Sequence, residues 1–223
     1  MNRRVVLSWS SGKDSAWALA ALTADPQIEL VALMTTFNED ADRVAMHAVR
    51  RQLAQAQAKA ADLPLIEVDL PWPCSNEDYE LRMADACQGL VDRGASHVAF
   101  GDLFLEDVRA YRERQLEGTG LAPMFPIWHP EGGTPALARR MVEAGLRAVL
   151  TCVDPKQLDP AFVGRTYDGA FLDALPDGVD PCGENGEFHT FCHAGPMFGS
   201  SIDVTVGEQV ERGGFWFADL LPA

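Results

Sequence analysis

The sequence contains no apolar stretch of membrane-spanning length, no internal repeat and no low-complexity tract. A helix that crosses a bilayer needs about 20 consecutive apolar residues, so an integral membrane protein is excluded. The apolar run after Arg3 and Arg4 is short, and a buried first strand accounts for it better than a signal peptide. We therefore expect a cytoplasmic protein without a membrane partner.

Positive charge is scarce, because 18 Lys and Arg residues face 33 Asp and Glu residues and leave a formal net charge of -15. Such a surface repels phosphate backbones, so nucleic acid is not an expected partner. Paired cysteines are also missing. The five that occur are typical of reduced thiols in the cytoplasm, being scattered and odd in number: Cys74, Cys87, Cys152, Cys182 and Cys192. No pattern sets the oligomeric state, and a homodimer is one arrangement that the sequence allows.

The 223 residues, 47% of them hydrophobic, suffice for a full α/β domain and a small second one. Strand-like and helix-like runs alternate at first, which predicts an α/β fold with a parallel sheet and helices on both faces. Expected strands are 5–9, 28–34, 65–70, 97–100 and 121–125, and expected helices are 15–23, 41–61, 76–93 (capped by Asn76) and 105–117. Later elements are a helix at 136–144, a strand at 148–153, a stretch rich in Pro, Gly and Asp up to residue 198, and a hairpin at 202–218. We expect two domains, 1–126 and 127–223, the second a smaller α+β substrate domain.

The first motif, which we call the serine loop, follows the strand at 5–9 and consists of Ser10, Ser11, Gly12, Lys13, Asp14 and Ser15. A strand that turns through small residues into a helix binds anions, because free N–H groups and the positive end of the helix dipole face the turn. The single glycine fits neither the Walker spacing nor the dinucleotide spacing. The loop resembles the S-G-G-x-D-S loop of the ATP pyrophosphatases (PP-loop enzymes), with Ser11 in place of the first glycine. An ordinary turn capped by serines is the alternative.

The resemblance implies ATP and Mg²⁺ as cofactors and a Rossmann-like fold. In PP-loop enzymes this loop holds the β and γ phosphates of ATP, and attack falls on the α-phosphate. Hydroxyl and amide groups of the loop would donate to phosphate oxygens, Lys13 would add positive charge, and Asp14 would be a metal ligand for Mg²⁺.

Ligands of open parallel sheets bind beyond the carboxyl ends of the strands, near the point where the strand order reverses. This rule brings the serine loop together with Thr35, Thr36 and Phe37 after the second strand and with Asp102 after the fourth. We expect Thr35, Thr36 and Phe37 to line the adenine, with the Phe37 ring packing against one face of the base. A polar strand end without a ligand is the alternative. Asp102 is expected to hold metal or to orient a substrate amine.

Three more residues are candidates for substrate binding. Arg109 and Glu113 lie four residues apart on one helical face, which fits a substrate clamp and a structural ion pair equally well. His47 could reach a substrate from the helix expected at 41–61, and a solvated helix histidine is the alternative.

The second motif, residues 181–193, combines two carboxylates, two imidazoles and a hydroxyl, and we call it the C-terminal motif. It is similar to the C-G-E-x-G-E-[YF]-x-T-F signature of the diphthine–ammonia ligase family, a branch of the PP-loop enzymes, and the resemblance extends over residues 4–206. It implies an acceptor pocket shaped by Glu184, Glu187, His189 and Thr190. Either Glu187 or His189 would be the base, and Asp102 would help to hold Mg²⁺. The alternative is a zinc site of unusual spacing at Cys182, His189, Cys192 and His193.

The resemblance thus implies an ATP-dependent amide ligase that adenylates a substrate carboxylate, releases pyrophosphate and transfers the acyl group to ammonia or an amine. In named members of the family the carboxylate belongs to a modified histidine of elongation factor 2. The Ala- and Arg-rich sequence has a bacterial style, and bacteria are not expected to contain that residue, so we expect another small-molecule or protein carboxylate. Two alternatives are a tRNA-modifying PP-loop enzyme, which the acidic charge and the missing cysteine pairs disfavour, and a regulatory module that binds ATP without chemistry.

Overall fold

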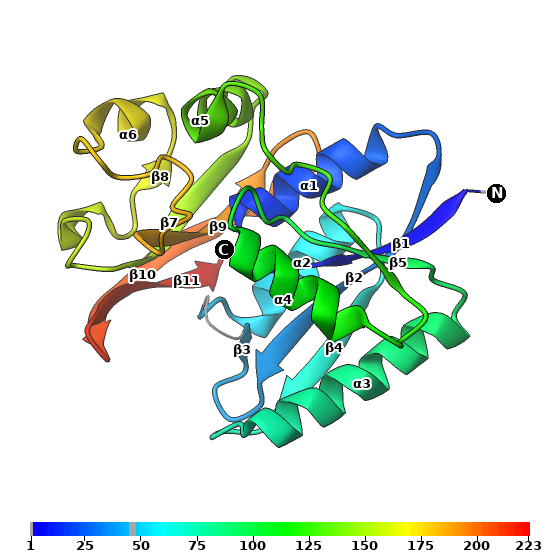
Figure 1. The fold of residues 1–223 in the computed structure, drawn as a ribbon. Coiled ribbons are helices and arrows are strands. Elements are labelled where there is room, and N and C mark those ends of the chain that lie inside the picture. The colour runs from blue at the N-terminus through cyan, green and yellow to red at the C-terminus, as the bar shows by residue number, and fades with distance from the viewer. Residues whose placement is uncertain (1, 45–47) are drawn as a thin grey trace.

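The computed structural model describes residues 2–44 and 48–223 (Figure 1). Its first part contains β1 (Arg3–Ser8), α1 (Lys13–Thr23), β2 (Ile28–Asn38), β3 (Arg43–Val44), α2 (Arg51–Ala60), β4 (Leu65–Leu70), α3 (Asn76–Asp92), β5 (His97–Ala99), α4 (Glu106–Leu116) and β6 (Ala122–Met124). Its second part contains α5 (Gly133–Glu143), β7 (Arg147–Val153), a short 3-10 helix (Pro160–Phe162), β8 (Thr166–Tyr167), α6 (Gly169–Ala174), β9 (Phe188–Ala194), β10 (Val204–Arg212) and β11 (Phe215–Pro222). No described helix combines the length and hydropathy that crossing a bilayer requires.

Five strands of the first sheet run parallel in the order β4, β2, β1, β5, β6, and the short β3 pairs antiparallel with the end of β2. Counted along the chain, the parallel strands have the doubly wound order 3-2-1-4-5. The order reverses between β1 and β5, which makes their carboxyl ends the switch point. The serine loop follows β1, and Gly101 and Asp102 follow β5. The α/β class predicted from the sequence is confirmed.

Both faces of this sheet are covered by helices. Val5 and Leu7 of β1 pack in a cluster with α1, whereas Val6 between them packs with residues of α3 and α4. Neighbouring residues of a strand point to opposite faces, so α1 and the pair α3 and α4 lie on opposite sides of the sheet. Figure 1 shows α3 and α4 in front of it. All three β1 residues are at most 1% exposed, as a parallel sheet between helices requires.

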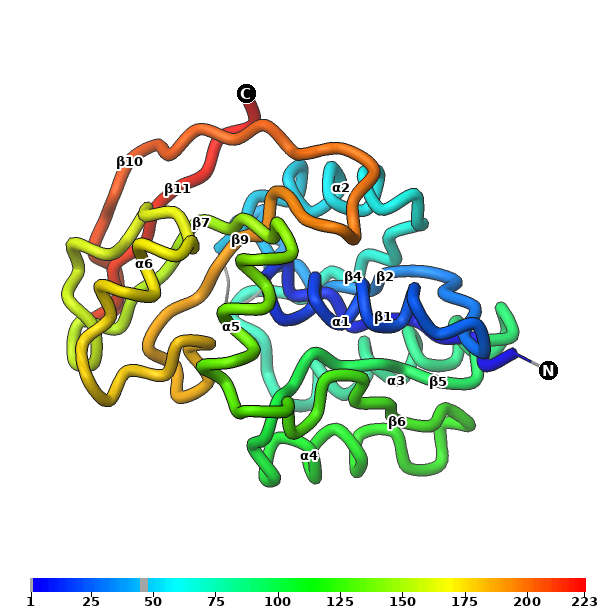
Figure 2. The backbone as a smooth tube through the Cα atoms, turned by 90° about the horizontal axis from the view of Figure 1, so that it is seen from above, coloured from blue at the N-terminus to red at the C-terminus, as the bar shows by residue number. Residues whose placement is uncertain are grey.

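The second sheet is antiparallel and is built around β7, which pairs with β8, β9 and β11. Its strand β9 packs against α1 of the first part, and Figure 2 shows the two parts side by side there. One hydrophobic cluster contains Leu7 and Leu19 of the first part together with Leu150 and Tyr167 of the second. Because the two sheets share this core, a division into domains 1–126 and 127–223 stays a prediction.

The helix predicted at 41–61 is wrong in its first half. β2 continues through Asn38, the chain returns as β3, and α2 begins only at Arg51. Arg51 fixes this start by donating to three carboxylates, those of Asp42, Glu67 and Asp69. These contacts outweigh the helix propensity of the preceding Ala- and Arg-rich segment. His47 lies outside the described residues.

Two smaller expectations are also wrong. Ser75 caps α3 in place of Asn76, because its Oγ accepts from the N–H of Asp78 at 3.0 Å. The stretch rich in Pro, Gly and Asp beyond residue 153, in which we predicted no strand before the hairpin, contains β9, and Thr190 and Phe191 of this strand are buried. Part of the C-terminal motif is therefore a core strand.

Candidate functional site

The serine loop turns sharply between β1 and α1. Ser11 has a φ of 69°, a left-handed conformation that costs a non-glycine residue about 1 kcal/mol. This cost is a physical reason for the glycine that PP-loop sequences have there. Gly101, after β5, approaches α1 so closely that a Cβ on it would lie 2.9 Å from the Ser15 nitrogen. The two loops of the switch point are therefore packed together at their backbones.

Strand β9 holds the serine loop from the second sheet. The Cys192 N–H donates to the Ser11 carbonyl at 2.9 Å, and the Lys13 N–H donates to the Thr190 hydroxyl at 3.1 Å. The first N–H groups of a helix lack partners within the helix, and Gly12 at the start of α1 has no capping side chain. Thr190 therefore caps α1 from 177 residues away in the sequence. The two sequence motifs meet at this point.

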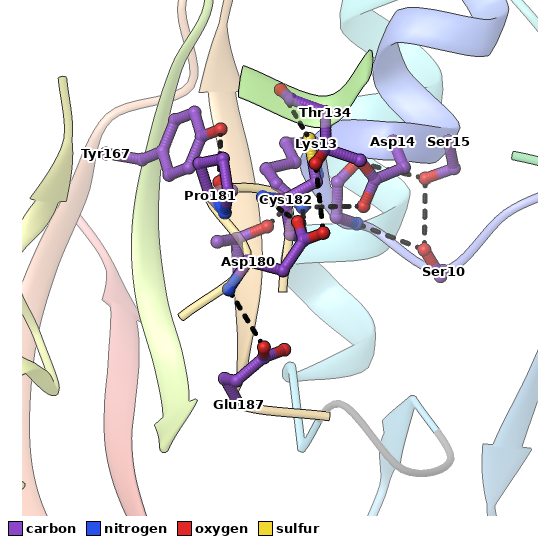
Figure 3. A network of polar contacts seen from close by, with 12 residues as sticks. Ser10, Lys13, Asp14, Ser15, Thr134, Tyr167, Asp180, Pro181, Cys182 and Glu187 are labelled. Atoms are coloured by element: carbon purple, nitrogen blue, oxygen red, sulfur yellow. Dashed lines mark hydrogen bonds and ion pairs between the residues drawn. The ribbon is translucent and has the colours of Figure 1, made fainter. Parts of the chain in front are cut away.

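Lys13 is buried, with 2% of its surface exposed, and its ammonium group lies beside the C-terminal motif (Figure 3). Nζ is 2.7 Å from Asp14 Oδ2, donates to the Cys182 carbonyl and lies within 5.7 Å of the Tyr167 and Phe188 ring centroids. Burial is the largest single effect and lowers the pKa of Lys13, but the charge and hydrogen bond of Asp14, together with Cys182 and Glu184, outweigh it, so that the pKa lies above its ordinary value. Lys13 is therefore charged and neutralises carboxylates of the site.

Carboxyl groups with raised pKa surround this ammonium group. Burial raises the pKa of Asp14, and burial together with the Asp14 charge raises the pKa of Glu184 to about 8. Burial also raises the pKa of Asp102, opposed by Arg112, whose Nε lies 3.4 Å from the carboxylate. Perturbed carboxyl groups in one cleft are typical of functional sites. Glu184 can therefore exchange a proton near neutral pH.

Glu187 has a different environment. It is 2% exposed, and its carboxylate accepts from the Asp180 N–H at 2.9 Å, the Asn185 N–H at 2.9 Å and Asn185 Nδ2 at 3.0 Å. Asp180 in turn accepts from Thr134 Oγ1 at 2.9 Å, which ties this turn to α5 (Figure 3). Both Glu187 oxygens are occupied within the C-terminal motif. The arrangement favours a positioning role over the role of base expected from the sequence.

His189 lines the cavity at the switch point and lies next to the buried Thr190. Burial, with a smaller contribution from the Lys13 charge, lowers the pKa of His189 to about 4. The imidazole is therefore neutral at pH 7 and holds a proton weakly, which makes it a poor candidate for the base.

The cavity has a volume of about 1200 Å³. One wall includes Ser8, Trp9 and Ser10 of the β1 end. Other lining residues come from α3, α4 and the β10–β11 hairpin and from the segments that follow β4 and β5, and the aromatic ones among them are Trp72, Tyr79, Phe100, Tyr111, Phe215 and Phe217. Most small-molecule sites measure about 300–1,000 Å³. The cavity is therefore large enough for a nucleotide together with a second substrate.

On α4 the cavity is lined by Arg112 and not by the predicted Arg109 and Glu113. Arg109 donates to Glu113 at 2.8 Å, and its guanidinium carbon lies 5.0 Å from the Phe125 ring and 5.1 Å from the Trp128 ring. This is the structural ion pair that the sequence left open. Sequence reasoning missed Arg112 as a site residue, because only the contact with Asp102 distinguishes it from its neighbours.

Of the three residues predicted to bind adenine, two line the cavity and one does not. Thr35 and Thr36 lie inside β2 and line the cavity. Phe37 is 0% exposed, packs in the core beside Leu53 of α2, and is covered by the Arg51 guanidinium at 4.0 Å from its ring centroid. The expectation that the Phe37 ring stacks on adenine is therefore wrong, because the ring is buried in the core and covered by Arg51.

Two buried oxygens of the serine loop, Ser11 Oγ and Asp14 Oδ1, have no hydrogen-bond partner among the described residues. A ligand donor or a cation would satisfy them. Mg²⁺ is usually bound by one or two carboxylates together with phosphates and water, so the loop fits this ion. In residues 2–44 and 48–223, no three His, Cys, Asp or Glu side chains are placed to hold a metal by themselves. The Cys182 and Cys192 thiols contact backbone carbonyls, and the zinc alternative gains no support.

The fold and the site first define a class: doubly wound α/β proteins with a tight serine-rich turn and a large cavity at the switch point. Within this class, the diphthamide synthase N-terminal domain matches residues 3–123, and the diphthamide synthase C-terminal domain matches residues 133–220. The chain belongs to the diphthamide synthase family, the diphthine–ammonia ligase family that the two motifs indicated. No match was found among curated proteins. The family is one of ligase-type enzymes.

Proposed function

We propose that the protein is an ATP-dependent amide ligase that adenylates a carboxylate, releases pyrophosphate and forms an amide with ammonia or an amine. One observation carries the proposal: β9 and the C-terminal motif contact the serine loop at the switch point. An anion-binding turn thereby lies beside a carboxyl group that exchanges protons near neutral pH. Both activation of a carboxylate and capture by an amine need these parts together.

The first step is nucleotide activation. In this proposal, hydroxyl and amide groups of the serine loop bind the phosphate oxygens of ATP. Mg²⁺, held by Asp14 with help from Asp102, would supply neutralisation of phosphate charge. Lys13 Nζ lies 2.7 Å from Asp14 Oδ2, and its charge opposes the rise in the Asp14 pKa that burial causes, which favours the ionised form that binds Mg²⁺. The substrate carboxylate oxygen attacks the α-phosphorus, the bond to the bridging oxygen breaks, and pyrophosphate leaves with that electron pair.

The second step needs a base, because an ammonium ion becomes a nucleophile only after it loses a proton. We assign this role to Glu184, whose pKa of about 8 lies near the working pH, where a general base is most effective. Glu187 is occupied by the backbone of its own turn, and His189 holds a proton too weakly. The amine attacks the acyl carbon, and AMP leaves with the oxygen.

The test of the reaction is product analysis. The protein is incubated with ATP, Mg²⁺, ammonium and a panel of carboxylates, and nucleotide products are separated. We expect AMP and pyrophosphate in equal amounts, together with an amide. ADP and phosphate as products would contradict the proposal. Turnover that depends on tRNA would identify a modification enzyme, and ATP binding without any turnover would identify a regulatory module.

The role of Glu184 predicts a pH profile. A base must be deprotonated, so the rate should rise with pH and level off above about pH 8. In Glu184→Gln the rate should no longer rise with pH and should be at least about 100-fold lower than in the wild-type protein. Glu187→Gln serves as the control and should keep the rise even where its stability is lower. A rise that persists in Glu184→Gln would assign the base elsewhere.

A further inference from the structure

A single glutamine of α2 joins three segments of the site. Gln57 is 0% exposed, and its side chain makes three hydrogen bonds that use both of its N–H donors. Its Oε1 accepts from the Trp9 indole N–H at 2.9 Å, and its Nε2 donates to the Ser11 carbonyl at 2.9 Å and to the Cys192 carbonyl at 2.6 Å. The side chain thus bonds to the end of β1, to the serine loop and to β9.

The Ser11 carbonyl is the central point of this arrangement. It accepts from Gln57 Nε2 and also from the Cys192 N–H, each at 2.9 Å. Ser11 has the left-handed φ of 69°, and such a conformation persists only where the surroundings enforce it. The peptide plane that carries this carbonyl also carries the Gly12 N–H. Two donors on the oxygen therefore set the direction of an amide of the anion-binding turn.

Burial of an amide side chain is unfavourable unless its groups are bonded, so an apolar residue would fill the position at lower cost. Its neighbour Gln55 shows the contrast. Gln55 is exposed on the same helix and bonds only to Glu67, at 2.8 Å. Among the described residues, Gln57 is the one buried side-chain amide, and it lies where the serine loop and β9 meet.

We propose that Gln57 is a positioning residue that holds the serine loop in its ligand-binding conformation and couples it to β9. The inference rests on the proposed function, since it assumes that the loop binds nucleotide phosphates. Loss of the amide removes one of two donors on the Ser11 carbonyl. The turn then samples other backbone conformations, and phosphate binding must restore the correct one.

The test compares Gln57→Met with two variants of α2. Gln57→Met keeps the length of the side chain and removes its hydrogen bonds. Leu53→Ala removes apolar contacts from a residue that is 1% exposed and serves as the control for lost stability. Gln55→Met serves as the control for lost polarity. ATP affinity is measured by titration with Mg²⁺ and ATP, and hydrogen exchange is measured on a peptide that covers residues 9–16.

We expect Gln57→Met to weaken ATP binding about 10-fold and to speed exchange in residues 9–16, whereas Leu53→Ala lowers the melting temperature with less than twofold change in affinity. Gln57→Glu keeps the acceptor for Trp9 but loses both donors, so it should resemble Gln57→Met. Equal effects of Gln57→Met and Leu53→Ala on exchange in residues 9–16 would overturn the inference. If the wild-type protein binds no ATP, the proposed function fails, and the exchange measurement still decides the role of Gln57.

Discussion

The two walls of the cavity differ in how their polar side chains are held. Behind the serine-loop wall, Lys13, Gln57 and Thr190 are at most 2% exposed and bond to partners from other elements. On the α4 wall, the side chain of Arg112 is 32% exposed, and its contact with Asp102 is long, at 3.4 Å. Water can replace a lost partner on the second wall but not on the first. The first wall is therefore fixed in geometry, and the second can change with little cost.

This difference fits a division of labour between a constant and a variable substrate. A nucleotide has the same shape in every turnover, so a rigid wall suits it. An acceptor would be recognised by the side chains of the α4 wall, which can vary without loss of the fold. We expect substitutions near the serine loop to affect the chemistry itself, and substitutions on α4 to affect which acceptor binds.

The largest effect is expected from Asp14→Asn. The substitution keeps the shape of the side chain but removes the charge that pairs with Lys13 at 2.7 Å and the oxygen available to Mg²⁺. Pyrophosphate release should fall at least about 100-fold, as for loss of one electrostatic group in an active site. Asp25→Asn, in a surface pair with Arg3, is the control and should stay within twofold. A rate of pyrophosphate release in Asp14→Asn comparable to that of the wild-type protein would show that Asp14 takes no part in the reaction.

A smaller effect is expected on the α4 wall, where two arginines can be compared directly. Arg112 lines the cavity beside Asp102, and Arg109 does not. Arg112→Met should raise KM for the most active carboxylate of the panel about 10-fold, equivalent to about 1.4 kcal/mol. Arg109→Met should change it less than twofold, because exposed pairs contribute only about 0.5 kcal/mol. The reverse order would return the substrate role to Arg109.

Asp219 of β11 is intermediate in exposure between the buried and the exposed polar side chains, since 24% of its side chain is exposed. Hydrogen bonds from Arg50 and Arg43 lower the pKa of Asp219 to about 2 despite partial burial. A folded-state pKa below the ordinary value of 3.8 stabilises the fold above pH 4, and this stabilisation is lost as pH falls towards 2. Asp219→Asn should cost about 2 kcal/mol at pH 6 and about half of that at pH 3. Urea titrations at both pH values measure it, and a constant difference would contradict the pairing.

The parallel sheet and the segments that form its strands followed from the sequence, because apolar runs and helix-like segments alternate there. The alternation also placed the serine loop and Asp102 at one edge of the sheet, as observed. The helix start at Arg51 could not be predicted, because contacts with three carboxylates that lie 9, 16 and 18 residues away decide it. Local propensity contains no information about such partners.

The site shows the same limit. The polar composition of the C-terminal motif indicated chemistry but not which carboxylate would be free. Glu184 and Glu187 differ only in their surroundings: Glu187 is bonded to its own turn, and Glu184 lies among Asp14, Asp102 and Lys13. Gln57 gave no signal at all, since a helix rich in Gln and Ala is usually a solvated one.

The smallest effect, and the sharpest measure of how rigid the first wall is, is expected from Ser11→Gly. Ser11 pays about 1–2 kcal/mol for its left-handed φ of 69°, and glycine avoids this but loses about 0.5–1 kcal/mol of chain entropy. The net gain in the free energy of unfolding should be about 0.5–1 kcal/mol, a rise in melting temperature of about 2–4 °C. Ser11→Ala keeps the strain and removes only the hydroxyl, so it should not show this gain. Equal stabilisation by both variants would assign the effect to the unpartnered Oγ and not to the backbone of the serine loop.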